Sequence, residues 1–213
     1  MLTPDPDCAL CPRLTEFRQV NRDAHPDFFN RPVPSFGEGD VRLLIVGLAP
    51  GLRGANRTGR PFTGDFAGDL LYAALQRHGF ARGSYAKHKD DGLELIGCRI
   101  ANAVRCVPPE NKPTPAEIAE CRPFLEAELK GLPKLEGVLA LGQIAHTATL
   151  AALGFKKSAK PFLHGAFHDL ADGLPWLANS YHCSRYNQNT RRLTPEMFDA
   201  VIAGLAKRVK PFD

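Results

Sequence analysis

The sequence VRLLIVGLAPGLRGANRTGRPFTGDFAGD, at residues 41–69, predicts a strand, a loop and a helix around which the rest of the chain is arranged. It begins with an apolar run rich in β-branched residues, which predicts a strand covered on both faces. Gly47 and Gly51 then flank Pro50, so the chain turns where the strand ends. A helix is expected at 65–79, because apolar residues recur there at helical spacing and a glycine ends the pattern. Ligands of open parallel sheets bind outside the carboxyl ends of the strands, so the loop between is a candidate site.

Strands and helices alternate along the rest of the chain. We expect further strands at 95–106, 137–141 and 176–181, an edge hairpin at 162–170, and helices at 14–21, 114–130, 142–153 and 194–210. The sequence Thr114-Pro115-Ala116-Glu117 supplies an N-cap hydroxyl, a proline at N1 and a glutamate at N3. Residues 80–94 carry many charges and are interpreted as an exposed loop. The alternation predicts an α/β fold with a parallel sheet covered by helices on both faces.

Composition limits the class of protein. With 213 residues, of which 44% are hydrophobic and 23% charged, the chain is long enough for one full core, so a single domain is expected. No apolar run approaches the length of a membrane span, and the beginning MLTPDPDCALCPR lacks the pattern of a signal peptide. These features predict a cytoplasmic protein without a membrane partner. A net charge of +4 permits an anionic partner such as nucleic acid but does not require one.

The six cysteines are interpreted as metal ligands, catalytic groups or buried thiols rather than disulfides. Cys8 and Cys11 form a CxxC pair, while Cys106 and Cys121 enclose the segment CVPPENKPTPAEIAEC. Four thiolates can hold zinc or a [4Fe-4S] cluster, and their spacing does not choose between them. Buried free thiols are the plainer alternative. For Cys98, inside a strand, and Cys183, inside the last loop, burial is the preferred interpretation.

Five blocks of the sequence carry a resemblance to a known family. They are GLAPG at 47–51, GRPFTGD at 59–65, NAVRCVPP at 102–109, the set Cys8, Cys11, Cys106 and Cys121, and HCSRYNQNTRRLT at 182–194. In this order the chain resembles the iron-sulfur uracil-DNA glycosylases of the type b group, family 5 of the uracil-DNA glycosylase superfamily. The resemblance implies a three-layer α/β/α sandwich around a central four-stranded parallel sheet. It also implies one domain over 1–213, with an N-terminal cluster-binding segment and a [4Fe-4S] cluster on those four cysteines.

The first of these blocks separates type b from its relatives. Type a relatives carry a carboxylate after the first glycine, and other superfamily members an Asn or Asp near the end of the block. This chain has Leu48 and Ala49, so a polar water-activating group is missing there. The resemblance makes the whole block a substrate cradle, formed by Gly47, Leu48, Ala49, Pro50 and Gly51.

Phe62 and Asn102 are the residues expected to hold a flipped base. Phe62 lies in a loop between two glycines, and stacking of a base on an aromatic ring contributes about 1–3 kcal/mol. Taken alone, it would be interpreted as a loop residue folded onto the core. Asn102 ends a strand and offers a donor and an acceptor to the Watson–Crick edge of uracil, although such an Asn is often only a turn former. The resemblance favours the functional interpretation of both.

Asp65 and His182 are the other two predicted catalytic residues. Asp65 is placed as a helix N-cap, and the resemblance adds a role in positioning water or stabilising the positively charged sugar. Asp69, one turn further on the same face, is the alternative carboxylate. His182 resembles the histidine that hydrogen-bonds O2 of the leaving base, a kind of interaction that contributes about 3 kcal/mol per donor. Relatives often have a proline after this histidine, whereas Cys183 stands here.

The loop that follows His182 is expected to contact DNA. The resemblance places Ser184, Arg185, Tyr186 and Asn187 in the minor groove, with Arg185 or Tyr186 filling the space left by the flipped base. Arg191 and Arg192 are phosphate-binding candidates, although exposed arginines often contribute only solubility.

The sequence therefore predicts a monomeric, monofunctional DNA glycosylase. It is expected to act on double-stranded DNA, to excise uracil and other deaminated bases such as hypoxanthine and xanthine, and to leave an abasic site. No motif places a lysine suited to Schiff-base chemistry. One alternative is a non-catalytic iron-sulfur protein that binds DNA or transfers electrons. Another is a nucleotide-binding enzyme, which fits less well because GLAPG lacks both the GxGxxG spacing and the Walker lysine.

Overall fold

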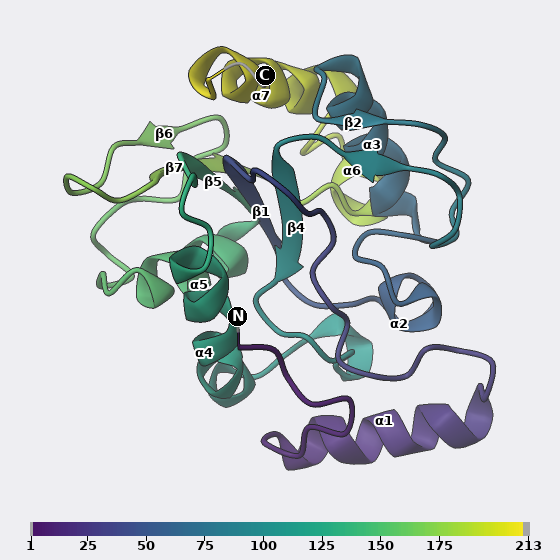
Figure 1. Ribbon diagram of the computed structural model, residues 1–213. Coiled ribbons are helices and arrows are strands. Elements are labelled where there is room, and N and C mark those ends of the chain that lie inside the picture. The colour runs from purple at the N-terminus through teal and green to yellow at the C-terminus, as the bar shows by residue number, and fades with distance from the viewer. Residues whose placement is uncertain (1, 211–213) are drawn as a thin grey trace.

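The computed structural model describes residues 2–210, which are built around one five-stranded sheet of order β4-β1-β5-β7-β6 (Figure 1). Its strands are β1 (Leu43–Gly47), β4 (Cys98–Asn102), β5 (Gly137–Leu141), β6 (Phe167–His168) and β7 (Trp176–Ser180). Four of them run parallel, as predicted, and the fifth, β6, pairs antiparallel with β7 at one edge. β6 lies inside the expected edge hairpin at 162–170, so the sheet has one short strand more than the predicted four.

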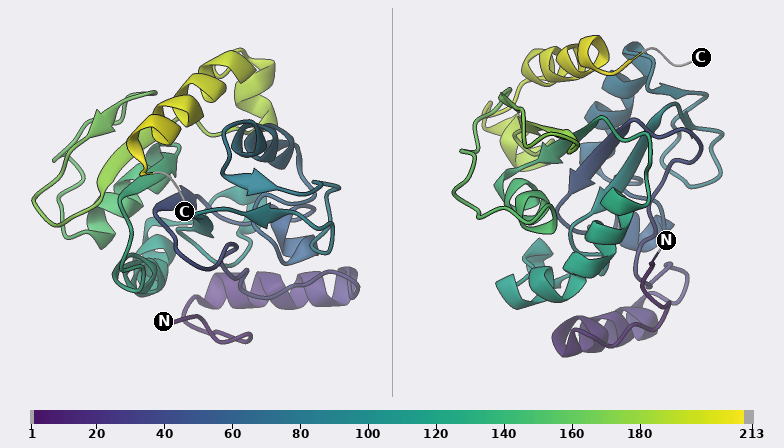
Figure 2. Two further views of the ribbon diagram at one scale, coloured as in Figure 1. Left: turned by 45° about the horizontal axis from the view of Figure 1, so that its top comes forward. Right: turned by 60° about the vertical axis from the view of Figure 1, so that its left-hand side comes forward.

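Helices cover both faces of the sheet. They are α1 (Pro12–Ala24), α2 (Ala55–Thr58), α3 (Phe66–Arg77), α4 (Pro115–Lys130), α5 (Gln143–Ala152), α6 (Arg185–Asn189), α7 (Pro195–Arg208) and the 3₁₀ turn η1 (Pro109–Asn111). α3 and α7 lie on one face and α4 and α5 on the other, which confirms the three-layer sandwich (Figures 1 and 2). None of the helices within residues 2–210 is long and apolar enough to cross a membrane.

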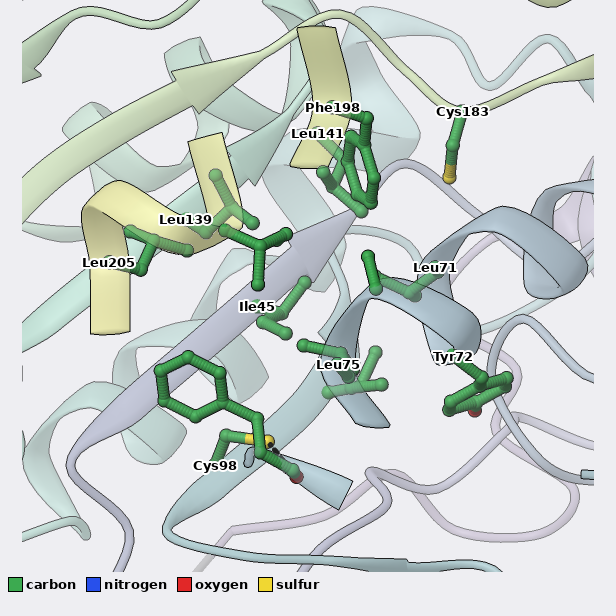
Figure 3. Packing of buried hydrophobic residues seen from close by; sticks show 14 of the residues in the cluster. Ile45, Leu71, Tyr72, Leu75, Cys98, Leu139, Leu141, Cys183, Phe198 and Leu205 are labelled. Carbon is green, nitrogen blue, oxygen red and sulfur yellow. Dashed lines mark hydrogen bonds between the residues drawn. The ribbon is translucent and has the colours of Figure 1, made fainter. Parts of the chain in front are cut away.

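The side chains on the two faces of β1 pack into two separate hydrophobic clusters. Leu43 and Ile45 pack with α3 and α7, whereas Leu44 and Val46 pack with α4 and α5. All four are fully buried, and burial of such a side chain contributes about 1.5–3 kcal/mol. Figure 3 shows Ile45 among leucines contributed by α3, β5 and α7. The sequence of β1 is continuously apolar because helices cover both faces of this strand.

Local signals place several helix ends correctly. The Thr114 hydroxyl accepts a hydrogen bond from the amide of Glu117, and the Glu117 carboxylate accepts one from the amide of Thr114, so the predicted capping box is confirmed.

The predicted burial of the two unassigned cysteines is also confirmed, because Cys98 and Cys183 are both 0% exposed. The Cys98 thiol donates to the carbonyl of Phe80 (Figure 3).

The interpretation of residues 80–94 as an exposed loop is confirmed for most of the segment, but it missed a short β-pair at the two ends. This segment forms a small antiparallel pair between β2 (Ala81–Arg82) and β3 (Glu94–Leu95), and it buries Leu93 and the carboxylate of Asp91. Asp91 is buried because the guanidinium of Arg60 pairs with it. The strand expected at 95–106 is therefore divided, with β3 in this hairpin and β4 in the central sheet.

Candidate active site

Three strand ends and one helix start meet at the carboxyl edge of the parallel sheet. Gly47 ends β1 directly beside Asn102, which ends β4, because the two residues are register partners. His182 follows β7 by two residues, and Asp65 caps α3. Residues from four separate segments thus converge where ligands of parallel sheets bind.

Gly47 lies against two of the predicted base-binding residues, Phe62 and Asn102. A methyl group on Gly47 would lie 2.4 Å from Asn102 Oδ1 and 2.7 Å from two ring atoms of Phe62. The Phe62 ring also stacks with the imidazole of His182, at 5.7 Å between centroids and 29° between planes. Asn102 is only 3% exposed, yet within residues 2–210 its side-chain amide makes no hydrogen bond. An aromatic face, an amide without a partner and an imidazole therefore share one small region.

A cleft of about 630 Å³ lies next to this region, and His182 is part of its wall. Predicted site residues that line it are Leu48, Ala49, Gly51, Asp65, His182, Ser184 and Arg185. Phe62 and Asn102 do not line this cleft and are only 6% and 3% exposed. Pro50 is buried in the turn, while Tyr186 and Arg191 are exposed outside the cleft wall. The volume is within the range of pockets that hold small molecules, so it has room for a nucleotide.

Asp65 is held rigidly at the cleft wall. Its Oδ1 accepts hydrogen bonds from the amides of Ala67, at 3.1 Å, and Gly68, at 3.2 Å, which confirms the predicted N-cap. Its Oδ2 lies close to Gly51 and Gly54, neither of which has a side chain to cover it. Burial raises the pKa of the Asp65 carboxyl above its ordinary value, although the two amides oppose the change.

The alternative carboxylate, Asp69, lines the same cleft but already has a partner. Lys87 Nζ donates to Asp69 Oδ2 at 2.8 Å, and the Asp69 side chain is 40% exposed. Asp69 Oδ2 is therefore already paired with a lysine, whereas no lysine or arginine within residues 2–210 forms a salt bridge with Asp65. Lys87, which belongs to the segment predicted as an exposed loop, also lines this cleft.

His182 is neutral over the physiological range. Burial lowers the pKa of its imidazole to about 4. Its carbonyl accepts from Asn187 Nδ2 at 2.8 Å, and the carbonyl of Cys183 accepts from Gln188 Nε2 at 2.7 Å. These bonds fix the turn in which relatives often have proline. A neutral imidazole can donate one N–H without bringing a full positive charge into the site.

The loop after His182 continues into the short helix α6. Ser184 caps this helix by accepting from the amide of Asn187 at 3.4 Å. The guanidinium of Arg185 lies over the ring of Phe66 at 5.0 Å and lines the cleft. Tyr186, by contrast, is 72% exposed and carries an aromatic ring into solvent. Arg185 is thus held at the wall, while Tyr186 projects away from the protein.

The four predicted ligand cysteines lie together on the other side of the turn that follows β1. Cys8, Cys11, Cys106 and Cys121 line one pocket. Burial raises the pKa of the Cys11, Cys106 and Cys121 thiols to about 11, and the neighbouring thiols add to this effect. Within residues 2–210, no group of three or more His, Cys, Asp or Glu side chains is arranged to hold a single metal ion.

Two nitrogen donors already point at sulfur atoms in this pocket. Arg18 Nη1 lies 3.7 Å from Cys106 Sγ, and the backbone amide of Arg105 lies 3.3 Å from Cys121 Sγ. Ala49, in the turn after β1, packs against the apolar cluster that also contains Cys121. The cysteine pocket and the active-site turn are therefore in contact. Two of the four thiols, those of Cys106 and Cys121, therefore have N–H donors of the kind that hydrogen-bond to the sulfurs of iron-sulfur clusters.

The fold and this site can now be compared with known proteins. A family model described as the uracil DNA glycosylase superfamily matches residues 34–206. The chain belongs to this superfamily. It is 48% identical over 200 residues to the Type-5 uracil-DNA glycosylase of Thermus thermophilus, covering 92% of this chain and 90% of that protein. It is 44% identical over 208 residues to the Type-5 uracil-DNA glycosylase of Mycobacterium leprae, covering 94% and 90%.

Type-4 relatives in the superfamily are less similar. The Type-4 uracil-DNA glycosylase of Pyrobaculum aerophilum is 37% identical over 123 residues, covering 57% of this chain and 55% of that protein. The predicted resemblance to the type b group of the superfamily is therefore confirmed. The matched model begins at residue 34, so α1 and the first cysteine pair lie outside it.

Sequence reasoning missed Asn111 as a residue of this superfamily site. Asn111 ends η1, lines the cleft, and its Oδ1 lies near Gly51 on the side that also faces Asp65 Oδ2. It and Glu110 both have positive φ, at 57° and 54°, which non-glycine residues rarely adopt. Strained backbone is concentrated at functional sites. The sequence signal was the short polar interruption Glu110-Asn111-Lys112 between prolines, which looks like an ordinary turn.

Proposed function

We propose that this protein is a monomeric, monofunctional DNA repair glycosylase. It flips uracil out of double-stranded DNA and hydrolyses the N-glycosidic bond, which leaves an abasic site. The observation that carries the proposal is the convergence of Phe62, Asn102 and His182 over Gly47. A flipped base needs a stacking surface, a group that reads its edge and a donor for its departing oxygen, and these three residues supply them. The names of the Type-5 relatives support the same activity.

Each residue has a distinct step in this mechanism. The uracil ring stacks on Phe62 while the amide of Asn102 pairs with its Watson–Crick edge. As the bond to the sugar lengthens, negative charge develops on the base and His182 donates its N–H to O2. The sugar becomes oxocarbenium-like, and the Asp65 carboxylate stabilises it and positions the attacking water. Leu48 and Ala49 supply no competing polar group.

The apolar cradle also supports a wider substrate range. Leu48 and Ala49 form no hydrogen bonds through their side chains, so the cradle selects bases through shape more than through a fixed donor pattern. Hypoxanthine and xanthine, which are deaminated purines, are therefore included in the proposal. Gly51 and Pro50 complete the turn that holds the sugar.

The loop after His182 is proposed as the DNA-binding element. Ser184, Arg185, Tyr186 and Asn187 enter the minor groove, and Arg191 contacts phosphate. Because Arg185 is stacked on Phe66 whereas Tyr186 is 72% exposed, Tyr186 is the better candidate to fill the gap left by the flipped base.

We further propose that the cysteine pocket holds a [4Fe-4S] cluster. Four thiols line one pocket, and four cysteine thiolates are the ligand set of such a cluster. Cys8, Cys11, Cys106 and Cys121 would hold it, and when bound it would cross-link the N-terminal segment to α4 and the NAVRC turn. Arg18 and the Arg105 amide would donate to its thiolates.

The cluster proposal predicts the effect of replacing Cys106 with serine. Protein purified without oxygen should be brown and contain iron, whereas Cys106→Ser should lose most of the iron and the visible absorption. Cys98→Ser is the matched control, because Cys98 is buried away from the pocket and a serine hydroxyl can still donate to the Phe80 carbonyl. A colourless wild-type protein containing zinc would exclude the cluster.

Activity is tested directly on a U:G duplex with a labelled strand. Purified protein should release uracil, and the strand should break only after alkali treatment. The matched T:G duplex should stay intact. Binding to the duplex without any alkali-sensitive product would instead support the alternative, a non-catalytic iron-sulfur DNA-binding protein. Strand breakage without alkali would exclude a monofunctional enzyme.

A further inference from the structure

Phe62 has a backbone conformation that its sequence does not favour. Its φ is 52°, in the left-handed region that non-glycine residues rarely occupy, yet its ring is buried against Gly47 and His182. Such a conformation persists only where neighbouring groups hold it. The structure must therefore contain groups that hold this residue, and most of them lie outside the sequence blocks that carry the family resemblance.

The hydroxyl of Tyr85 bridges the backbone on both sides of Thr63. It donates to the carbonyl of Phe62 at 3.2 Å and accepts from the amide of Gly64 at 3.4 Å. One residue earlier, the hydroxyl of Tyr72 donates to the carbonyl of Pro61 at 2.6 Å. Two phenols thus fix the peptide groups that set the height and tilt of the Phe62 ring.

Gly68 makes room for this bridge. A methyl group there would lie 1.9 Å from the carbonyl oxygen of Phe62 and 2.3 Å from the hydroxyl of Tyr85. The first turn of α3 can therefore approach the bridge only because residue 68 has no side chain. The helix capped by Asp65 and the loop carrying Phe62 are consequently in direct backbone contact.

A buried ion pair holds the hairpin that supplies Tyr85. Arg60 donates to both oxygens of Asp91 at 2.8 Å, and its Nε donates to Thr63 Oγ1 at 2.8 Å. The same carboxylate accepts from the amides of Ala86, at 2.8 Å, and Leu93. Burial would raise the pKa of Asp91, but the Arg60 and amide hydrogen bonds outweigh it and lower this pKa to about 2. The pair is therefore charged throughout the physiological range.

The Arg60 guanidinium also lies over aromatic rings. Its distance to the ring centroid is 4.9 Å for Phe36, 5.7 Å for Tyr72 and 6.0 Å for Tyr85. Arg60 thus connects the loop before Phe62, the carboxylate of the hairpin and the ring of the bridging tyrosine. An ion pair, cation–π contacts and hydrogen bonds of one side chain therefore hold the loop before Phe62 and the hairpin together.

We propose that Tyr85, supported by the Arg60–Asp91 pair, is a positioning residue that holds Phe62 at the stacking position of the flipped base. This inference rests on the proposed function, because it needs Phe62 to be the stacking surface. The 81–95 hairpin is then part of the catalytic apparatus although none of its residues touches the base. Displacing a positioned group by about 1 Å can cost up to about 100-fold in rate.

Tyr85→Phe tests the proposal, since it removes the bridging hydroxyl and keeps the ring. The excision rate on a U:G duplex, measured with enzyme in excess, should fall about 10-fold. Binding of a duplex that contains an abasic site should not change, because that ligand has no base to stack. Arg82→Ala is the matched control on the same hairpin. Arg82 is exposed and, among residues 2–210, pairs only with Glu94, so the rate should stay at the wild-type value.

A double-mutant cycle with Phe62→Ala distinguishes positioning from general support of the fold. If Tyr85 acts through Phe62, the variant carrying both changes should be as slow as Phe62→Ala alone. Multiplicative losses would overturn the positioning role, as would a wild-type rate for Tyr85→Phe. A wild-type rate for Phe62→Ala would instead overturn the proposed stacking function itself. Melting temperatures of all variants show that the compared proteins are folded.

Discussion

Replacing Asp65 with asparagine is expected to lower the rate of uracil release about 100-fold, the loss typical of removing one electrostatic group from an active site. The substitution isolates the charge, because asparagine is also a favourable N-cap and can still accept from the amides of Ala67 and Gly68. α3 should therefore begin at the same residue. The measurement is the single-turnover rate on a U:G duplex.

The pH dependence of the rate gives a second readout of Asp65. Burial raises the pKa of this carboxyl above 3.8, so the wild-type rate should fall as the pH drops toward that raised pKa and the carboxylate is protonated. His182 stays neutral down to about pH 4 and contributes no limb above that value. Asp65→Asn should flatten the acidic limb as well as lower the plateau.

The same residue should lower stability at neutral pH. A carboxyl whose folded pKa is raised favours the folded state below pH 3.8, and this contribution is lost as the pH rises through the folded pKa. Asp65→Asn removes the buried charge, so its melting temperature at pH 7 should exceed that of the wild type. A gain in stability with a loss of activity is the pattern of a residue kept for catalysis.

Asp69→Asn is the matched control for Asp65. Asp69 lies one helical turn away in the same cleft, but it is 40% exposed and paired with Lys87, and exposed pairs contribute little. Its removal should change the rate by less than about 5-fold. A wild-type rate for Asp65→Asn together with a large loss for Asp69→Asn would assign the water-handling role to Asp69.

The parts of the fold that sequence predicted are those governed by local patterns. The buried run of β1, the capping box at Thr114 and the helix that starts at Asp65 each depend on residues close together in the chain. The clustering of site residues was also predictable, because parallel strands end at the same edge of a sheet. Residues 47, 102 and 182 followed from that rule once the strands were assigned.

What sequence did not predict depends on partners distant in the chain. Asp91 looks like one more charge in a polar loop until Arg60, 31 positions earlier, is seen to neutralise it. The left-handed φ of Phe62 has no sequence signature, because an aromatic residue rarely adopts it and hydrogen bonds from distant residues hold it. The buried contacts of the otherwise exposed 80–94 segment were missed for this reason, and the segment supplies both Tyr85 and Lys87 to the site.

Replacing Gly47 with alanine is expected to abolish most excision, with a loss of about 100-fold or more, because a group misplaced by about 1 Å can cost this much. The φ of Gly47 is not in the left-handed region, so alanine is allowed by the backbone. Its methyl group, however, would lie 2.4 Å from Asn102 Oδ1 and 2.7 Å from the Phe62 ring. Both must move, and overpacking of this kind costs about 1–3 kcal/mol of stability.

Binding separates a blocked base pocket from a misfolded protein. Gly47→Ala should bind a duplex with an abasic site as tightly as the wild type does, but should bind a duplex with an uncleavable 2′-fluoro-deoxyuridine more weakly, because only that ligand places a base over residue 47. Gly51→Ala is the comparison, since its methyl group would meet Asp65 Oδ2 at 3.5 Å and Asn111 Oδ1 at 3.9 Å, which are ordinary contacts. Its rate should stay much closer to that of the wild type. Full activity of Gly47→Ala would mean that the base does not enter between Phe62 and Asn102, and the site would have to be sought higher in the cleft.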